Sequence, residues 1–175
     1  PHPSTLRPVD HALRETLEAG FAQVSQLIEA VKLRAALAET LRLARAVNVY
    51  LEQAPWFRVI KTDKAAAATT VYTALWAIDS LKLLFAPFLP HSSENLHQLL
   101  GYDEPLFGAL TIQQVGEKED THNILAYGPK PEEGKSNRFL PSQLAAGQRL
   151  QPPVPLFRKL DEEIIEEELA RLTAG

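Results

Sequence analysis

The residues best suited to binding another molecule lie in the stretch NVYLEQAPWFRVIKTDK, residues 48–64. Trp56 stands directly after a proline and is followed at short intervals by Arg58 and Lys61. An indole ring flanked by cations suits an unpaired nucleic-acid base, because the base stacks on the ring while the cations bind phosphates. The alternative is a structural tryptophan that closes the end of a hydrophobic core. The residue pattern alone leaves both interpretations open.

The sequence contains no recognisable catalytic motif. The glycines are isolated, and none is followed by the Lys-Ser/Thr pair of a phosphate-binding loop. His91 and His97 are six residues apart, which does not place both on one helix face as metal ligands. The acidic run DEEIIEEE near the C-terminus fits a solvated helix face, and the absence of cysteine excludes thiolate sites. We therefore expect no catalytic residue, no metal and no cofactor in this chain.

The net charge of −4 is unevenly distributed along the chain. Residues 1–100 carry ten Lys/Arg and nine Asp/Glu, whereas residues 101–175 carry eight and thirteen. A polyanion such as nucleic acid would therefore have to bind a local basic face in the first part. No apolar run approaches the roughly 18 residues that a spanning helix needs, so no membrane is expected. The lack of an export leader and of cysteine favours the cytoplasm.

Glycine divides the chain into two expected parts. Gly20 is the only glycine before residue 101, so we expect residues 1–101 to form a helical bundle. Residues 102–175 are expected to form an irregular extension that wraps back and ends in a short helix near residues 161–172. The expected fold class is all-α.

Apolar periodicity places four main helices in the first part, beginning near Pro8, Val31, Thr62 and His91. For the second helix, the repeating leucines predict a buried stripe made of Leu33, Leu37, Leu41, Ala44 and Leu51. Asn48 falls within this stripe, and a buried amide needs partners, so it is expected to bond to a neighbouring helix. Tyr50 is expected to tie helices together in the same way.

The third helix has more than one apolar face, which is typical of a central helix in a bundle. Its Trp76 has apolar neighbours and is expected to be a core residue. Leu41 on the second helix and Leu75 on the third are both expected to be buried.

Three blocks of the chain resemble one protein family. ARAVNVYLEQAPWFRVIKTD is similar to the second anticodon-domain helix and following turn of methionyl-tRNA synthetases, which are class I aminoacyl-tRNA synthetases. LLFAPFLPHSSENLHQLLG is similar to the next block, and LAAGQRLQPPVPLFRKLDEEIIEEELARL to the end of these enzymes. Valyl, isoleucyl and leucyl enzymes carry a similar Pro-Trp bundle and remain the alternative, but the final Pro-Leu-Phe block separates methionyl enzymes from them.

The resemblance implies a C-terminal anticodon-binding domain that reads the CAU anticodon of tRNA(Met). It implies that Trp56 is a platform for the first anticodon base and that His91 could contact another. The tRNA backbone would be bound by Arg45, Arg58 and Lys61. The catalytic domain, which uses ATP, and the first helix of the anticodon domain would lie upstream of residue 1, so the chain alone is expected to be inactive. A helical interaction module that docks through the proline-rich PPVPLF is the rival interpretation.

Overall fold

The computed structural model describes residue 3 and residues 5–108, 110–116, 121–127, 139–157 and 162–173. Most of these residues are helical, so the predicted all-α class is confirmed, with one small antiparallel sheet added. In chain order the elements are α1 (Pro8–Glu29), α2 (Leu33–Gln53), α3 (Trp56–Val59), α4 (Lys64–Phe85), α5 (Pro90–Leu99), β1 (Leu110–Val115), β2 (His122–Tyr127) and α6 (Glu162–Thr173).

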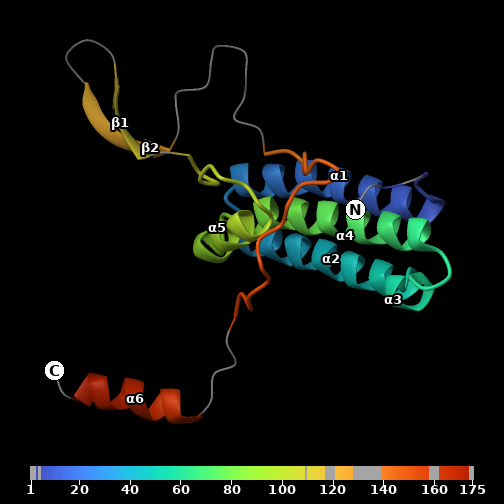
Figure 1. Cartoon of the computed structure of the whole chain (residues 1–175). Coiled ribbons are helices and arrows are strands. Elements are labelled where there is room, and N and C mark those ends of the chain that lie inside the picture. Colours follow the sequence, from blue (N-terminus) through green and yellow to red (C-terminus); the bar gives the residue numbers. More distant parts are fainter. Residues whose placement is uncertain are drawn as a thin grey trace.

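The three long helices α1, α2 and α4 pack side by side, and α5 packs against α4 (Figure 1). Pro8 starts α1, which suits a residue that has no N–H to donate. Asp63 caps α4 by accepting a hydrogen bond from the Ala66 N–H at 2.9 Å. The short helix α3 lies at the end of the bundle where α2 turns into α4. None of the described helices is long and apolar enough to cross a membrane.

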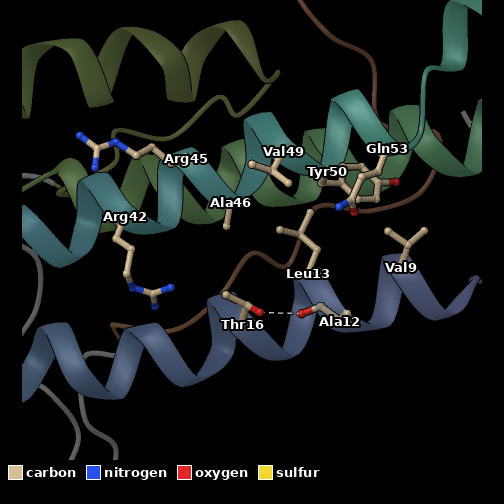
Figure 2. Close-up of a pocket in the computed structure, with 10 residues that line it drawn as sticks. All are labelled: Val9, Ala12, Leu13, Thr16, Arg42, Arg45, Ala46, Val49, Tyr50 and Gln53. Atoms are coloured by element: carbon tan, nitrogen blue, oxygen red, sulfur yellow. Dashed lines mark hydrogen bonds between the residues drawn. The ribbon is translucent and has the colours of Figure 1, made fainter.

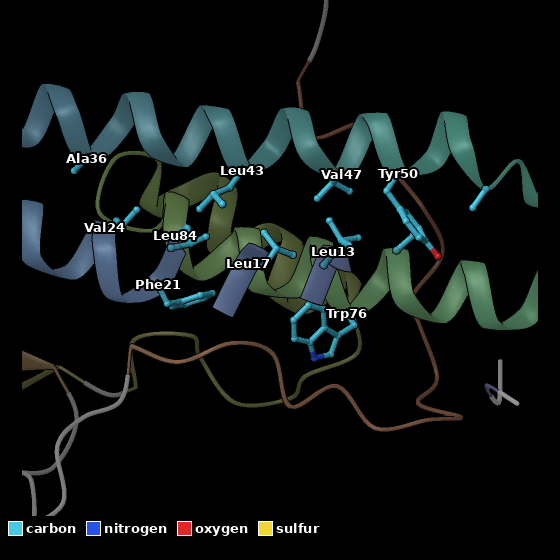
Figure 3. Packing of buried hydrophobic residues seen from close by; sticks show 13 residues of the cluster. Leu13, Leu17, Phe21, Val24, Ala36, Leu43, Val47, Tyr50, Trp76 and Leu84 are labelled. Carbon is cyan, nitrogen blue, oxygen red and sulfur yellow. The ribbon is translucent and has the colours of Figure 1, made fainter. Parts of the chain in front are cut away.

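The hydrophobic core lies between α1, α2 and α4 (Figure 3). Its fully buried members include Leu17 and Val24 from α1, Leu43 from α2 and Leu84 from α4. Trp76 is buried, as predicted, and its indole N–H donates to the backbone carbonyl of Ser142 at 3.0 Å. The core thus also holds part of the C-terminal region in place.

The predicted stripe of α2 is wrong in its register. The buried face is made of Ala36, Thr40, Leu43, Val47 and Tyr50. Leu41 is 44% exposed, and Leu75 on α4 is only half-buried. Asn48 is exposed, so its predicted burial is also wrong, whereas Tyr50 is buried and bonds across to α1 as expected.

Close approach of α1 and α2 explains this register. A Cβ atom added at Gly20 of α1 would overlap with Cδ1 of Leu43, so α1 passes α2 where one helix has no side chain. Gly20 leaves space for the Leu43 side chain, so the face of α2 that carries Leu43 packs against α1, while Leu33 and Leu41 lie at the surface. The periodicity of the leucines therefore marked the wrong face.

Residues 139–157 lie along the bundle as an extended segment, which we call the strap. Ser142 in the strap accepts the Trp76 indole N–H, and its own N–H donates to Ser80 Oγ at 3.0 Å. Tyr72 donates to the carbonyl of Leu144 at 3.0 Å. The strap is thus fastened to α4 by a series of hydrogen bonds along that helix.

A buried ionic cluster lies beneath the strap. Lys82 and Asp79, both on α4, form an ion pair at 2.5 Å with their side chains almost fully buried. Lys82 Nζ lies 2.7 Å from Nδ1 of His97 on α5, and because a charged lysine can only donate, this nitrogen is unprotonated. Tyr102 stacks on the His97 ring at 4.2 Å, and its hydroxyl donates to Asp79 at 2.9 Å. Ser142 also donates to Asp79, so the cluster joins α4, α5 and the strap.

The fold is therefore expected to lose stability on mild acidification. Burial, and next the charge of Lys82, lowers the pKa of His97, although Asp79, Glu94 and the backbone of Glu104 act in the opposite direction. As the pH falls through the unfolded-state pKa of about 6.5, the unfolded chain takes up a proton that the folded chain does not. Urea unfolding between pH 8 and pH 5 should show the free energy of unfolding decreasing through this window.

The matched variants for this experiment are His97→Gln and His91→Gln. The first should flatten the pH dependence, whereas the second, at an exposed position, should retain it. If the His97→Gln and wild-type curves ran parallel, the decrease would have to come from another group.

Candidate nucleic-acid interface

The chain bends sharply between α2 and α3, and this bend brings Trp56 to the surface. The Ala54 N–H still donates to the carbonyl of Tyr50 at 2.8 Å, which completes the last turn of α2. Pro55 has no N–H with which to continue the helix, and Trp56 begins α3. The Ile60 N–H donates to the carbonyl of Trp56 at 3.0 Å and closes the short helix. Trp56 is 39% exposed and is not part of the buried core.

Phe57 forms an aromatic surface together with Trp56. The two rings meet edge to face, with centroids 6.1 Å apart and planes at 87°. Phe57 is 59% exposed, and the Arg58 guanidinium lies 5.8 Å from its ring centroid. Phe57 was not predicted as a site residue, although its position beside Trp56 in the string PWFR was a signal for it. The arrangement offers exposed ring faces beside a cation, which suits the stacking of unpaired bases.

Three cations follow these two rings in the chain. Arg58 lies in α3, Lys61 follows this helix and Lys64 begins α4, and all three are exposed. Two acids lie in the same stretch, since Glu52 is exposed in the last turn of α2 and Asp63 is the cap of α4. The three cations outnumber these two acids, so the α3 end of the bundle presents an excess of positive charge next to exposed aromatic rings, a combination that suits a single-stranded nucleic acid.

Arg45 lies apart from these cations, in a groove between α1 and α2 (Figure 2). The groove has a volume of about 370 Å³. It is lined from α1 by Val9, Ala12, Leu13 and Thr16, and from α2 by Arg42, Arg45, Ala46, Val49, Tyr50 and Gln53. Arg42 is paired with Glu39 at 2.6 Å. Arg45 precedes the end of α2 by eight residues, or about 12 Å along the helix axis, so it can contact a ligand that extends from α3 along α2.

His91 lies at the opposite end of the molecule from Trp56. It is exposed in the first turn of α5, which follows the C-terminal end of α4, whereas α3 precedes the start of α4 (Figure 1). Since α4 has 22 residues, about 33 Å separates its two ends. The structure thus brings Trp56, Arg58 and Lys61 together but does not bring His91 to them.

Comparisons with known proteins point to one family. A family model described as the anticodon-binding domain of methionyl-tRNA ligase matches residues 1–123. The methionine–tRNA ligase of Thermomicrobium roseum is 51% identical over 99% of this chain, and that of Chloroflexus aggregans is 47% identical over 98%. The chain covers only 30% and 28% of these two proteins.

The fold is also shared with solved structures. The ligand-free methionyl-tRNA synthetase of Mycobacterium tuberculosis aligns with 92% of this chain at a TM-score of 0.68 and 19% identity, over 28% of that protein. The resemblance seen in the three sequence blocks is therefore confirmed, and the valyl, isoleucyl and leucyl alternative is not supported. The chain belongs to the family of methionyl-tRNA ligase anticodon-binding domains.

Proposed function

We propose that this chain binds the anticodon loop of tRNA(Met) through the α3 end of its bundle. It does so as the C-terminal part of a methionine–tRNA ligase whose catalytic domain, with its ATP site, lies outside the 175 residues. The observation that carries this proposal is the exposed pair Trp56 and Phe57 with Arg58 and Lys61 around it. Membership of the anticodon-domain family supports tRNA as the nucleic acid that is bound.

The mechanism is differential binding, in which the tRNA that fits the surface is held and presented to a distant catalytic site. One unpaired anticodon base stacks on Trp56, an interaction typically worth about 1–3 kcal/mol. Arg58 and Lys61 bind the phosphates on either side, and Arg45 binds the backbone farther along α2. Stacking tolerates any base, so discrimination of CAU requires polar groups that read base edges as well.

The C-terminal extension has the features of a segment that packs on the rest of a longer polypeptide. Ile165, Leu169 and Leu172 of α6 are all strongly exposed and recur at the spacing of one helix face. We propose that residues 102–175 wrap back along the bundle and that α6 packs against the catalytic domain. Leu156 and Phe157 line an apolar groove with α4 and α5 of their own chain, while Phe157 remains 65% exposed.

The proposed location is the cytoplasm, where a ligase of this kind supplies translation with charged tRNA.

Removing positive charge at the α3 end should make tRNA binding less dependent on salt. The double variant R58Q/K61Q of the full-length protein is expected to bind tRNA(Met) more weakly. The slope of log K against log salt should shrink by about one for each phosphate that the variant no longer binds. Dissociation constants measured from 50 to 300 mM KCl give this slope directly.

Lys32→Gln is the matched control, since Lys32 precedes the opposite end of α2. It removes one of the two positive charges that the double variant removes, and it should leave the slope nearly unchanged. Equal slopes for R58Q/K61Q and wild type would mean that the phosphate backbone binds elsewhere.

A further inference from the structure

A buried hydrogen-bonded group joins three helices close to the RNA-binding end. We call it the Tyr50 clamp, made of Arg7, Asp10, Tyr50 and Thr70. The Tyr50 hydroxyl donates to Asp10 Oδ1 at 2.7 Å, and both residues are almost fully buried. The Arg7 guanidinium donates to both oxygens of Asp10, at 2.8 and 2.9 Å, and to Thr70 Oγ1 at 2.7 Å. The start of α1, the end of α2 and the start of α4 are therefore held by one polar group.

The clamp holds both anchors of the bend that carries Trp56. Tyr50 lies in the last turn of α2, and its carbonyl accepts the N–H of buried Ala54, two residues before Trp56. Thr70 lies in the second turn of α4, whose capping residue Asp63 directly follows the α3 region. Because α3 lies between these two anchors, the angle between α2 and α4 sets the direction in which Trp56 points.

The hydroxyl of Tyr50 is suited to fixing an angle. Burial, and next the hydrogen bond to Asp10, raise the pKa of Tyr50 to about 12, so the hydroxyl stays protonated and donates at neutral pH. A phenylalanine would fill the same apolar space between α1 and α2, and Asp10 would keep its bonds from Arg7. Apolar packing alone tolerates small rotations of a helix, whereas a directional hydrogen bond to a buried carboxylate does not.

We infer that Tyr50 is a positioning residue for RNA binding, which acts by holding the α2–α3 bend so that Trp56 faces the anticodon loop. This inference rests on the proposed function. It assigns Tyr50 a role in affinity for tRNA that goes beyond its contribution to the stability of the bundle.

The test is a double-mutant cycle in the full-length protein with tRNA(Met) as the probe. Tyr50→Phe is expected to weaken tRNA binding about three- to tenfold, the loss of one well-formed hydrogen bond transmitted to the bend. If Tyr50 acts through Trp56, adding Tyr50→Phe to Trp56→Ala should cause no further loss, because the ring that the clamp positions is already absent. Methionine activation by Tyr50→Phe should be unchanged.

Tyr72→Phe is the matched control. Tyr72 lies on α4, and its hydroxyl bond goes to the carbonyl of Leu144 in the strap, so tRNA binding should stay at the wild-type level. Losses that multiply in the Y50F/W56A variant, or wild-type binding by Tyr50→Phe, would overturn the inference. Wild-type binding by Trp56→Ala would instead overturn the proposed function itself, so the two failures are distinguishable.

Discussion

Replacing Trp56 with alanine in the full-length protein is expected to lower kcat/KM for charging tRNA(Met) by about ten- to a hundredfold. The physical reason is the loss of a stacking surface for one anticodon base. Trp56 is 39% exposed and lies outside the core, so its removal should leave the melting temperature almost unchanged. Methionine activation should also be unaffected, because that reaction does not use the anticodon. Charging, activation and thermal melting measured on one protein preparation give all three quantities.

Phe57→Ala offers a comparison within the same aromatic surface. The Phe57 ring is more exposed than the Trp56 ring and meets it edge to face. The Phe57→Ala variant therefore tests whether any exposed ring at this end contributes to tRNA charging. If Trp56 had a purely structural role, Trp56→Ala would instead lower the stability of the domain, and the loss of charging would follow from unfolding. The domain would then be destabilised by about 3–5 kcal/mol, as for buried tryptophans, and charging would recover on cooling.

Leu43→Ala is expected to reduce the free energy of unfolding by about 2–5 kcal/mol. Leu43 is fully buried and packs directly over Gly20 of α1. Truncating it removes apolar packing and leaves a cavity that two closely packed helices cannot easily fill. Urea unfolding of the purified chain, with the slope of the transition compared between variants, measures this loss.

Leu41→Ala supplies the matched control, since it makes the same chemical change two residues away at a side chain that is 44% exposed. It should cost less than about 1 kcal/mol. Equal losses for the two variants would contradict the helix register described here.

The fold class and the helices follow from the sequence, but the buried face of α2 does not. Leu33, Leu37 and Leu41 suggested one stripe because leucine is the most apolar choice at each position. The observed face instead includes Leu43, which packs into the space that Gly20 of α1 leaves free. Helix-to-helix distance is a property of two elements together, so the periodicity of one element cannot reveal it.

In the candidate site, residues that are adjacent in sequence could also be predicted to act together, whereas contacts between residues far apart in sequence could not. Trp56, Arg58 and Lys61 are neighbours in sequence, and Pro55 fixes where α2 must end, so a local pattern was enough to propose them together. The bond from Tyr50 to Asp10 joins residues 40 positions apart, and no local pattern identifies such a pair. The length of α4, about 33 Å, which separates His91 from Trp56, likewise follows only from the three-dimensional arrangement.

The central claim is that Trp56 stacks on an anticodon base, and one binding cycle tests it most directly. Wild type and Trp56→Ala are each titrated with an anticodon stem-loop RNA carrying CAU and with the same RNA made abasic at the first anticodon position. The abasic RNA keeps its phosphates, so only the base is removed.

If the base stacks on Trp56, either change alone should weaken binding about ten- to a hundredfold. Both changes together should then weaken it no further than one of them. Losses that multiply when the ring and the base are removed together would show that the two do not touch, and would contradict the claim.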